Sequence, residues 1–153
     1  MATYFFDSSA LAKRYITETG TPWVRGITDS FSGDRVYVAR ITLVEIVSAI
    51  ARRGRRGDIT PSDMATALTD VRSDFKALFE VIAVNGRLIN LATVLVERHA
   101  LRAYDSVQLA AATQVNSAYI GNALPPVTFV SADTTLNTAA KSEGLTVEDP
   151  NTH

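Results

Sequence analysis

The sequence predicts an α/β fold, a three-layer α/β/α sandwich around a central, mostly parallel, twisted sheet. Short apolar segments with strand character alternate along the chain with longer segments whose apolar residues recur at helical spacing. This alternation is typical of parallel strands joined by right-handed helical crossovers. The 153 residues contain no Pro/Gly/Ser-rich linker, internal repeat or low-complexity tract, so we expect a single domain over residues 1–150.

Each expected element has its own sequence signal. The expected strands are TYFF (3–6), RVYVA (35–39), VIAV (81–84), VTFV (127–130) and LTVE (145–148). The expected helices are SSALAKRY (8–15), TLVEIVSAIARR (42–53), the segment 61–79, RLINLATVLVERHAL (87–101), DSVQLAAATQV (105–115) and TTLNTAAKSEG (134–144). Thr60 is the expected N-cap of the third helix, with Pro61 at its first position. Gly144 is the expected C-cap of the last.

The composition excludes several classes of protein. Hydrophobic residues make up 46% and charged residues 20%, and no apolar run approaches the roughly 18 residues of a membrane span. The N-terminus lacks the positively charged start of a signal peptide, so we expect a cytoplasmic protein with no membrane partner. There is no cysteine, and His99 and His153 are the only histidines. Any metal must therefore be held by oxygen.

Three acids follow expected strands. Asp7 comes directly after the first strand, Glu45 lies near the start of the helix after the second, and Asp133 lies three residues beyond the fourth. In open parallel sheets the ligand site lies outside the carboxyl ends of the strands, so these acids should converge. Clustered carboxylates repel one another unless a hard cation such as Mg²⁺ or Mn²⁺ neutralises them.

Helix capping is the alternative explanation for each acid taken singly. Thr42 and Glu45 fit a capping box, in which Glu45 reaches back to the first amide of its helix. Asp133 can cap the helix that follows it, and Asp7 can accept from the amides of Ser9 or Ala10. Capping accounts for the acids one by one but not for their clustering.

Four ordered segments carry a resemblance to a known family. YFFDSSALAKRY, ITLVEIVSAI, LRAYDSVQLAAA and FVSADTTLNTAAKSEGL resemble the motifs of PIN-domain proteins, in particular the VapC-like toxins of prokaryotic toxin–antitoxin pairs. The resemblance covers nearly the whole chain and places one acid in each segment. It implies that the acidic quartet is Asp7, Glu45, Asp105 and Asp133.

The resemblance adds residues that their positions relative to the expected strands do not single out. Asp105 follows a helix, so by itself it would be taken as a negative charge at a helix N-terminus. Ser9 and Ser131 match positions where the family tends to carry Ser or Thr, where they could hold a carboxylate or a metal-bound water; helix capping is the alternative.

The resemblance also implies an activity. PIN-like proteins are nucleases, and the VapC branch typically cuts RNA, so a metal-activated water would hydrolyse the phosphodiester and leave a 3'-hydroxyl and a 5'-phosphate. The implied partners are a cognate antitoxin and a second copy of the chain. Two other functions remain open: another metal-dependent phosphoesterase on the same scaffold, or a catalytically silent partner-binding domain. A covalent aspartyl nucleophile is disfavoured because such enzymes usually carry a second Asp where Ser9 stands.

Three further segments raise separate hypotheses. Arg52, Arg53, Arg55 and Arg56 form the only concentrated basic cluster in a chain of net charge −1. They either end a helix or contact phosphates, and we expect them about 15 Å from the acids, where distal RNA or an acidic partner segment could bind. Residues 88–96 are apolar nearly all round their helix, which indicates a core helix or an oligomer interface. Residues 114–127 are longer than the family usually needs, which suggests a loop over the site or a partner surface.

Overall fold

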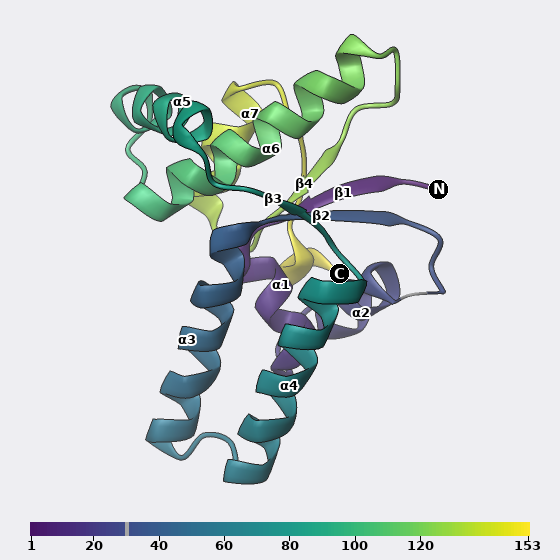
Figure 1. The fold of residues 1–153 in the computed structure, drawn as a ribbon, viewed down its shortest axis with the longest axis vertical. Helices are drawn as coiled ribbons and strands as arrows, with labels where there is room; N and C mark the ends of the chain where they lie inside the picture. Colours follow the sequence, from purple (N-terminus) through teal and green to yellow (C-terminus); the bar gives the residue numbers. More distant parts are fainter. Residues whose placement is uncertain (30) are drawn as a thin grey trace.

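The computed structural model describes residues 1–29 and 31–153 and contains one five-stranded sheet whose strands are all parallel. The strands are β1 (Thr3–Phe6), β2 (Arg35–Ala39), β3 (Glu80–Ile82), β4 (Thr128–Val130) and β5 (Thr146–Glu148), in the spatial order β3-β2-β1-β4-β5 (Figure 1). The chain therefore starts in the middle of the sheet, builds outward to β3, and then returns to build the other half.

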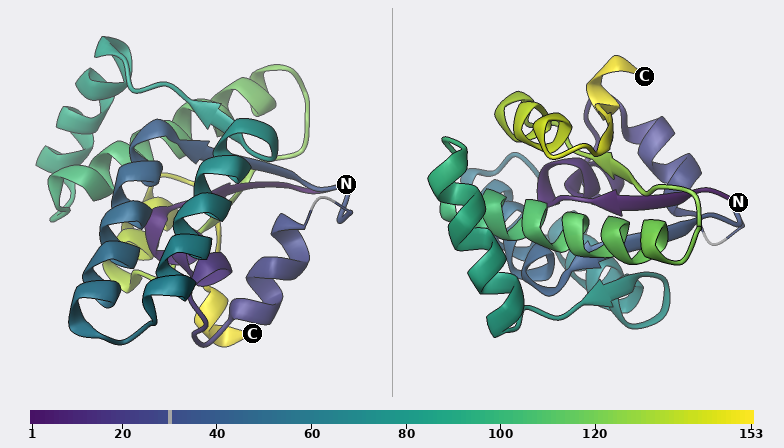
Figure 2. Two further views of the ribbon diagram at one scale, coloured as in Figure 1. Left: turned by 60° about the horizontal axis from the view of Figure 1, so that its bottom comes forward. Right: turned by 90° about the horizontal axis from the view of Figure 1, so that it is seen from above.

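Helices cover both faces of the sheet (Figure 2). They are α1 (Ser8–Tyr15), α2 (Thr21–Thr28), α3 (Arg40–Arg56), α4 (Pro61–Ala77), α5 (Gly86–Arg98), α6 (Ala103–Gly121), α7 (Thr134–Ser142) and a short 3₁₀ helix, η1 (Pro150–Thr152). Helices α1 to α4 pack on one face and α5 to α7 on the other. The prediction of a three-layer α/β/α sandwich is confirmed, and the sheet is parallel throughout.

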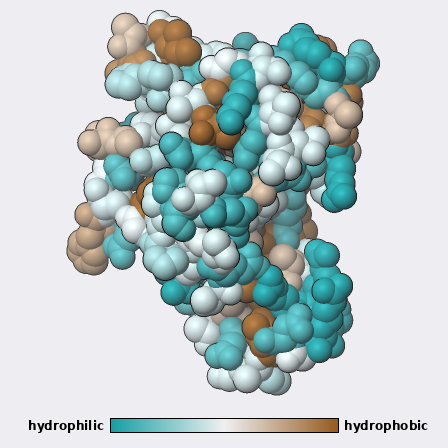
Figure 3. Space-filling model, turned by 180° about the vertical axis from the view of Figure 1, so that it is seen from behind, coloured by the Kyte–Doolittle hydropathy of each residue, from teal (hydrophilic) through white to brown (hydrophobic). Residues whose placement is uncertain are grey.

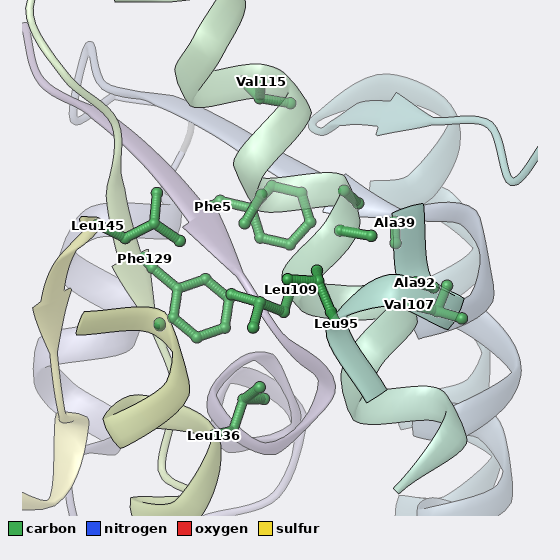
Figure 4. Packing of buried hydrophobic residues seen from close by; sticks show 14 of the residues in the cluster. Phe5, Ala39, Ala92, Leu95, Val107, Leu109, Val115, Phe129, Leu136 and Leu145 are labelled. Atoms are coloured by element: carbon green, nitrogen blue, oxygen red, sulfur yellow. The ribbon is translucent and has the colours of Figure 1, made fainter. Parts of the chain in front are cut away.

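The core is divided by the sheet into two layers. Successive residues of β1 point to opposite faces, so Phe5 packs with α5, α6 and α7 while Phe6 packs with α1 to α4. Phe5 stacks against Phe129 of β4 with a ring-centroid distance of 6.1 Å, and Leu109 and Leu136 close this layer from the helices (Figure 4). Because both faces are covered, the strands read as continuous apolar runs rather than as alternating ones.

Several element boundaries match the sequence signals. Thr60 caps α4 by accepting from the Asp63 amide, with Pro61 at the first helical position. Gly57, at φ 79°, ends α3 after its arginines. At the end of α7 the expected C-cap is off by one residue, because Glu143 is the C-cap and Gly144 follows it with φ 82°.

Other boundaries correct the predictions. Helix α2 was not predicted; its only signals are Gly20, which adopts φ 83°, and a proline in the first turn. Helix α6 continues to Gly121, so the expectation of a loop over 114–127 is wrong for its first eight residues. Val115 and Tyr119 pack against the core and hold this extension, and the Asn116 side chain accepts from the Val127 amide at 2.9 Å.

The surface is mixed in character. On the face drawn in Figure 3, hydrophobic residues form separate spots, and hydrophilic side chains gather at the lower end, over the projecting pair α3 and α4. Helix α5 buries Leu88, Ala92 and Leu95 but exposes Ile89 and Val94. Among the residues that the structure describes, no helix is both long enough and apolar enough to cross a lipid bilayer.

We predict opposite effects for two glycine substitutions in α2. Gly20→Ala should lower the free energy of unfolding by about 2 kcal/mol or more, because Gly20 has a left-handed φ and its added Cβ would lie 2.1 Å from the Pro150 carbonyl oxygen of η1. Gly26→Ala should raise it by about 0.5–1 kcal/mol, because the position is helical and a Cβ there meets nothing within 4 Å. Urea denaturation measures both, and equal effects would contradict the docking of η1 on Gly20.

Candidate active site

The candidate site lies at the point in the sheet where the order of the strands reverses. The chain leaves β1 for β2 on one side, while β4 returns to the other side of β1, so the carboxyl ends of β1 and β4 form the topological switch point. Asp7 follows the last residue of β1, and Ser131 follows the last residue of β4. The Asp7 amide donates to the Val130 carbonyl at 3.1 Å, which extends the pairing of the two strands into the site.

The Asp7 carboxylate is buried and held by hydrogen bonds. Its side chain is the N-cap of α1 and accepts from the Ala10 amide at 2.9 Å. The Ser9 hydroxyl donates to the carboxylate at 2.8 Å, and the Ser131 hydroxyl donates to Oδ2 at 2.9 Å. Each hydroxyl also accepts a backbone amide from the loop after β4, Ser9 from Ala132 and Ser131 from Asp133. The two serines therefore tie this loop to Asp7.

Burial dominates the electrostatics of Asp7. The residue is only 3% exposed, and desolvation raises the pKa of its carboxyl group from 3.8 to about 7. The hydrogen bonds from Ala10, Ser9 and Ser131 favour the charged form but do not outweigh burial, and the negative charge of Glu45 raises the pKa further. Without a bound cation, Asp7 is thus protonated in roughly half of the molecules at neutral pH.

Glu45 is oriented by two side chains from other helices. The Ser8 hydroxyl donates to Oε2 at 2.8 Å, and the Gln108 amide donates to Oε1 at 2.7 Å. The capping-box interpretation is wrong, because α3 begins at Arg40 with Ala39 as its N-cap, which puts Thr42 inside the helix and Glu45 in its second turn. Burial raises the pKa of Glu45, and the charge of Asp105 adds to this effect.

Gln108 is a site residue that sequence reasoning missed. It is 1% exposed, and its Nε2 donates both to Glu45 and, at 2.8 Å, to the hydroxyl of the fully buried Thr42. The opposite amide orientation would set the carbonyl oxygen against the Glu45 carboxylate, so the amino group must face Glu45. Gln108 follows Asp105 by three residues on α6, and this same-face spacing was the available signal.

Asp105 and Asp133 complete a chain of repelling carboxylates. Asp133 caps α7 by accepting from the Leu136 amide at 2.9 Å, as expected, and Asp105 lies in the first turn of α6. Burial raises the pKa of Asp105, and the charge of Asp133 raises it further. The negative charge of Glu45 thus raises the pKa of Asp7, that of Asp105 raises the pKa of Glu45, and that of Asp133 raises the pKa of Asp105. The structure brings the four predicted acids to one edge of the sheet.

The donor chemistry fits a hard divalent cation. The carboxylates supply only oxygen ligands, and their mutual repulsion and raised pKa values are what a bound cation relieves. Within residues 1–29 and 31–153, however, no three His, Asp or Glu side chains converge closely enough to form a ready-made metal centre. The carboxylates are close enough to repel but are not gathered around one point.

A groove of about 700 Å³ runs along α1 and α3, and Glu45 is the acid of the quartet that lines it. Ser8, Ser9 and Glu45 line it at the acidic edge, and Arg52 lines it further along α3. Arg52 thus lines the same groove as Glu45 from two turns further along α3, and the expected separation of about 15 Å between the arginine cluster and the acids stays a prediction. Arg53 instead forms an ion pair with Glu18, and Arg55 and Arg56 are exposed at the end of α3.

A parallel α/β sandwich with an acidic cluster at the β1–β4 switch point is the arrangement of a PIN-like domain. No model of a known protein family matches the sequence. The chain is, however, 31% identical over 147 residues to Ribonuclease VapC45 and to Ribonuclease VapC49, each from a strain of Mycobacterium tuberculosis; the match covers 96% of this chain and 95% of each relative. The chain belongs to the VapC family, which confirms the resemblance seen in its motifs.

Two solved structures share the fold. FitAcB from Neisseria gonorrhoeae superposes with a TM-score of 0.64 at 15% identity, over 97% of this chain and 98% of that one. PAE2754 from Pyrobaculum aerophilum superposes with a TM-score of 0.60 at 22% identity, over 99% and 91%. The sandwich is thus found in proteins whose sequences differ widely from this one.

We predict that the stability of the metal-free protein falls as the pH rises. The pKa of Asp7 is about 7 in the folded state and lower in the unfolded state, so the folded protein binds this proton more tightly. The stability that the proton contributes is fully present below about pH 4 and is lost as the pH rises through 7. Asp7→Asn keeps an acceptor for Ala10 but removes the buried charge. At pH 8 in chelator it should raise the free energy of unfolding by a few kcal/mol, since one pKa unit corresponds to about 1.4 kcal/mol.

Urea denaturation at a series of pH values measures this effect. Asp58→Asn, which removes an exposed carboxylate, is the matched control and should leave the pH profile of the parent protein unchanged. If Asp7→Asn also keeps that profile, Asp7 does not titrate as burial requires.

We predict that Gln108→Leu lowers the free energy of unfolding by about 1–3 kcal/mol, because it leaves the Thr42 hydroxyl and one Glu45 oxygen without their donor. Gln114→Leu, on the same helix and only partly buried, is the control and should change stability by less than about 0.5 kcal/mol. Equal urea midpoints for the two variants would show that the Gln108 contacts contribute nothing.

Proposed function

We propose that this protein is a metal-dependent endoribonuclease, the toxin component of a VapBC-type pair, acting in the cytoplasm. The observation that carries the proposal is the series of four carboxylates at the β1–β4 edge, in which each repels the next and the buried Asp7 stands at one end. The names of the VapC relatives agree with ribonuclease chemistry. The proposed catalytic and metal-binding residues are Asp7, Glu45, Asp105 and Asp133.

The proposed cofactor is Mg²⁺ or Mn²⁺, since the site offers only oxygen ligands. A bound divalent cation would supply Lewis-acid polarisation of the phosphodiester and activation of the attacking water. Asp7 must lose its proton before it can act as a ligand, so cation affinity should increase with pH up to about 7.

The remaining polar side chains would act by holding the carboxylates. Ser9 and Ser131 donate to Asp7 and fix its plane, and both are anchored by amides of the loop after β4. Ser8 and Gln108 fix the Glu45 carboxylate from two sides. This preorganisation lowers the cost of assembling four like charges around a substrate that is itself an anion. The expected products carry a 3'-hydroxyl and a 5'-phosphate.

We also propose two protein partners. The exposed Ile89, Val94 and Val96 on α5 support a homodimer interface, because these side chains gain nothing from solvent exposure in a monomer. Val44, 60% exposed at the groove, supports an antitoxin segment that reaches toward the acids. The expected assembly is a dimer of toxins bound to a cognate antitoxin.

RNA cleavage by the purified chain tests the proposal. We expect cleavage with Mn²⁺ or Mg²⁺ and none with chelator, and Asp7→Asn/Asp105→Asn should reduce the rate at least about 100-fold, as removal of a positioned catalytic group does. Asp58→Asn/Asp63→Asn, which removes two exposed carboxylates beyond the site, is the matched control and should cleave normally. Parallel reactions with DNA and small phosphate esters distinguish a phosphoesterase of another specificity.

Thermal melting supplies an independent readout. A cation that binds only the folded state raises the melting temperature by mass action, so Mn²⁺ should stabilise the parent protein but not Asp7→Asn/Asp105→Asn. No cleavage of any substrate together with no shift in melting temperature would leave the acids as helix caps and make the chain a partner-binding domain.

A further inference from the structure

The groove beside the acids has features that the four carboxylates do not explain. Its walls carry small residues, among them Ala12, Ala49 and Ala132, and the ion pair between Lys13 and Glu18. At the acidic edge it is bordered by Glu45 and by the aromatic ring of Tyr104. Further along α3 it is bordered by Arg52. An elongated ligand at the acids would therefore meet an aromatic ring and then a cation.

Tyr104 stands apart from the other tyrosines. The structure describes all five, and the other four, Tyr4, Tyr15, Tyr37 and Tyr119, pack against the two core layers. Tyr104 is 59% exposed, lines the groove and immediately precedes Asp105. The fold therefore does not need this ring for packing, and its position next to an acid of the quartet leaves it available to a ligand.

Arg52 is the cation of this groove that is left without a partner in the part of the chain that the structure describes. Its neighbours Lys13 and Arg53 both pair with Glu18, whereas the structure shows no ion pair or hydrogen bond for Arg52. Arg52 follows Glu45 by seven residues, which is two turns or about 10 Å along the helix axis. It can therefore reach a negative charge beyond the one held at the acids.

We propose that this groove is a subsite for single-stranded RNA, in which Tyr104 stacks on an unpaired base next to the scissile phosphate and Arg52 contacts a phosphate further along the same strand. The inference rests on the proposed ribonuclease function and assigns substrate-binding roles to Tyr104 and Arg52 of this chain. Tyr104 and Arg52 are specificity and binding residues; the chemistry stays with the carboxylates.

Two physical reasons favour a single strand over a duplex. In an A-form duplex the faces of the bases are covered by their neighbours, so only an unpaired base can stack on a tyrosine. Duplex binding without stacking relies on many phosphate contacts, whereas the chain has a net charge of −1 and the groove offers one unpaired arginine.

RNA matches the two charged ends of this groove better than the antitoxin segment proposed above, which would compete with RNA there. A cationic segment matches the acids but meets Arg52, and an acidic segment matches Arg52 but meets the carboxylates. RNA suits both ends of the groove, because a cation bound at the acids would contact one phosphate and Arg52 would contact another.

Binding measured in chelator at low salt tests the subsite without cleavage. The probes are a short unstructured RNA with a fluorescent label and the same RNA annealed to its complement. Tyr104→Ala should weaken single-strand binding about 10-fold, within the 1–3 kcal/mol that a base–aromatic stack contributes, and Tyr104→Phe should restore it. Phe31→Ala removes an aromatic ring that is 95% exposed elsewhere and is the matched control.

Arg52→Ala should weaken single-strand binding and reduce the slope of log affinity against log salt by roughly 0.7, the contribution of one phosphate contact on a single strand. Arg72→Ala, an exposed arginine on α4, removes the same charge and should change neither quantity. Duplex binding should be weaker than single-strand binding and insensitive to Tyr104→Ala.

Cleavage kinetics with Mn²⁺ separate this proposal from the proposed function. Tyr104→Ala should raise KM about 10-fold with little change in kcat, because the ring binds substrate away from the bond that breaks. If the parent protein cuts RNA but KM and affinity are unchanged in Tyr104→Ala and Arg52→Ala, the subsite is overturned while the ribonuclease stands, and the groove is left to a protein partner. If the parent protein neither binds nor cuts RNA, both proposals are wrong.

Discussion

The parallel pairing of β1 with β4 is the constraint on which the site depends. It places Asp7 and Ser131 at adjacent strand ends, although 124 residues separate them in sequence. Because both strands lie in the centre of the sheet, the carboxylate that follows β1 is covered on all sides. Burial, and not any single neighbour, is the main cause of its raised pKa. A solvent-exposed aspartate at the end of an edge strand would not have this property.

Burial of Asp7 sets the stability of the metal-free protein against the cation binding that we propose for this residue. In the metal-free protein a charged Asp7 is costly, and its hydrogen bonds only partly offset that cost. The donors that surround it nevertheless favour the carboxylate, which is the form that a cation needs. The fold therefore keeps a destabilising group in a fixed orientation, as functional sites often do. A purely structural cap would have no reason to be buried among other acids.

Sequence patterns predicted the sheet, most helices and three of the four acids, because each of those features is local. Apolar runs indicate the strands; Asp7 follows such a run directly, and Glu45 and Asp133 come within a few residues of one. Asp105 follows a helix and was reached only through the family resemblance. Gln108 and Ser8 were missed because their role depends on contacts between helices that are far apart in sequence. The length of α6 was missed for the same reason, since its last turns are held by packing on the core.

Capping and catalysis are not competing explanations for these acids. A cap uses one carboxylate oxygen and turns the side chain toward a helix N-terminus, where the dipole favours negative charge. Asp133 caps α7 through Oδ1, and the structure shows no hydrogen bond to its Oδ2 from the residues it describes. Helix starts at the carboxyl ends of parallel strands thus bring Asp7 and Asp133 to one edge and stabilise them there, and at Asp133 the cap occupies only one of the two oxygens. Capping helps the fold to tolerate two of the four charges, while Glu45 is held instead by Ser8 and Gln108.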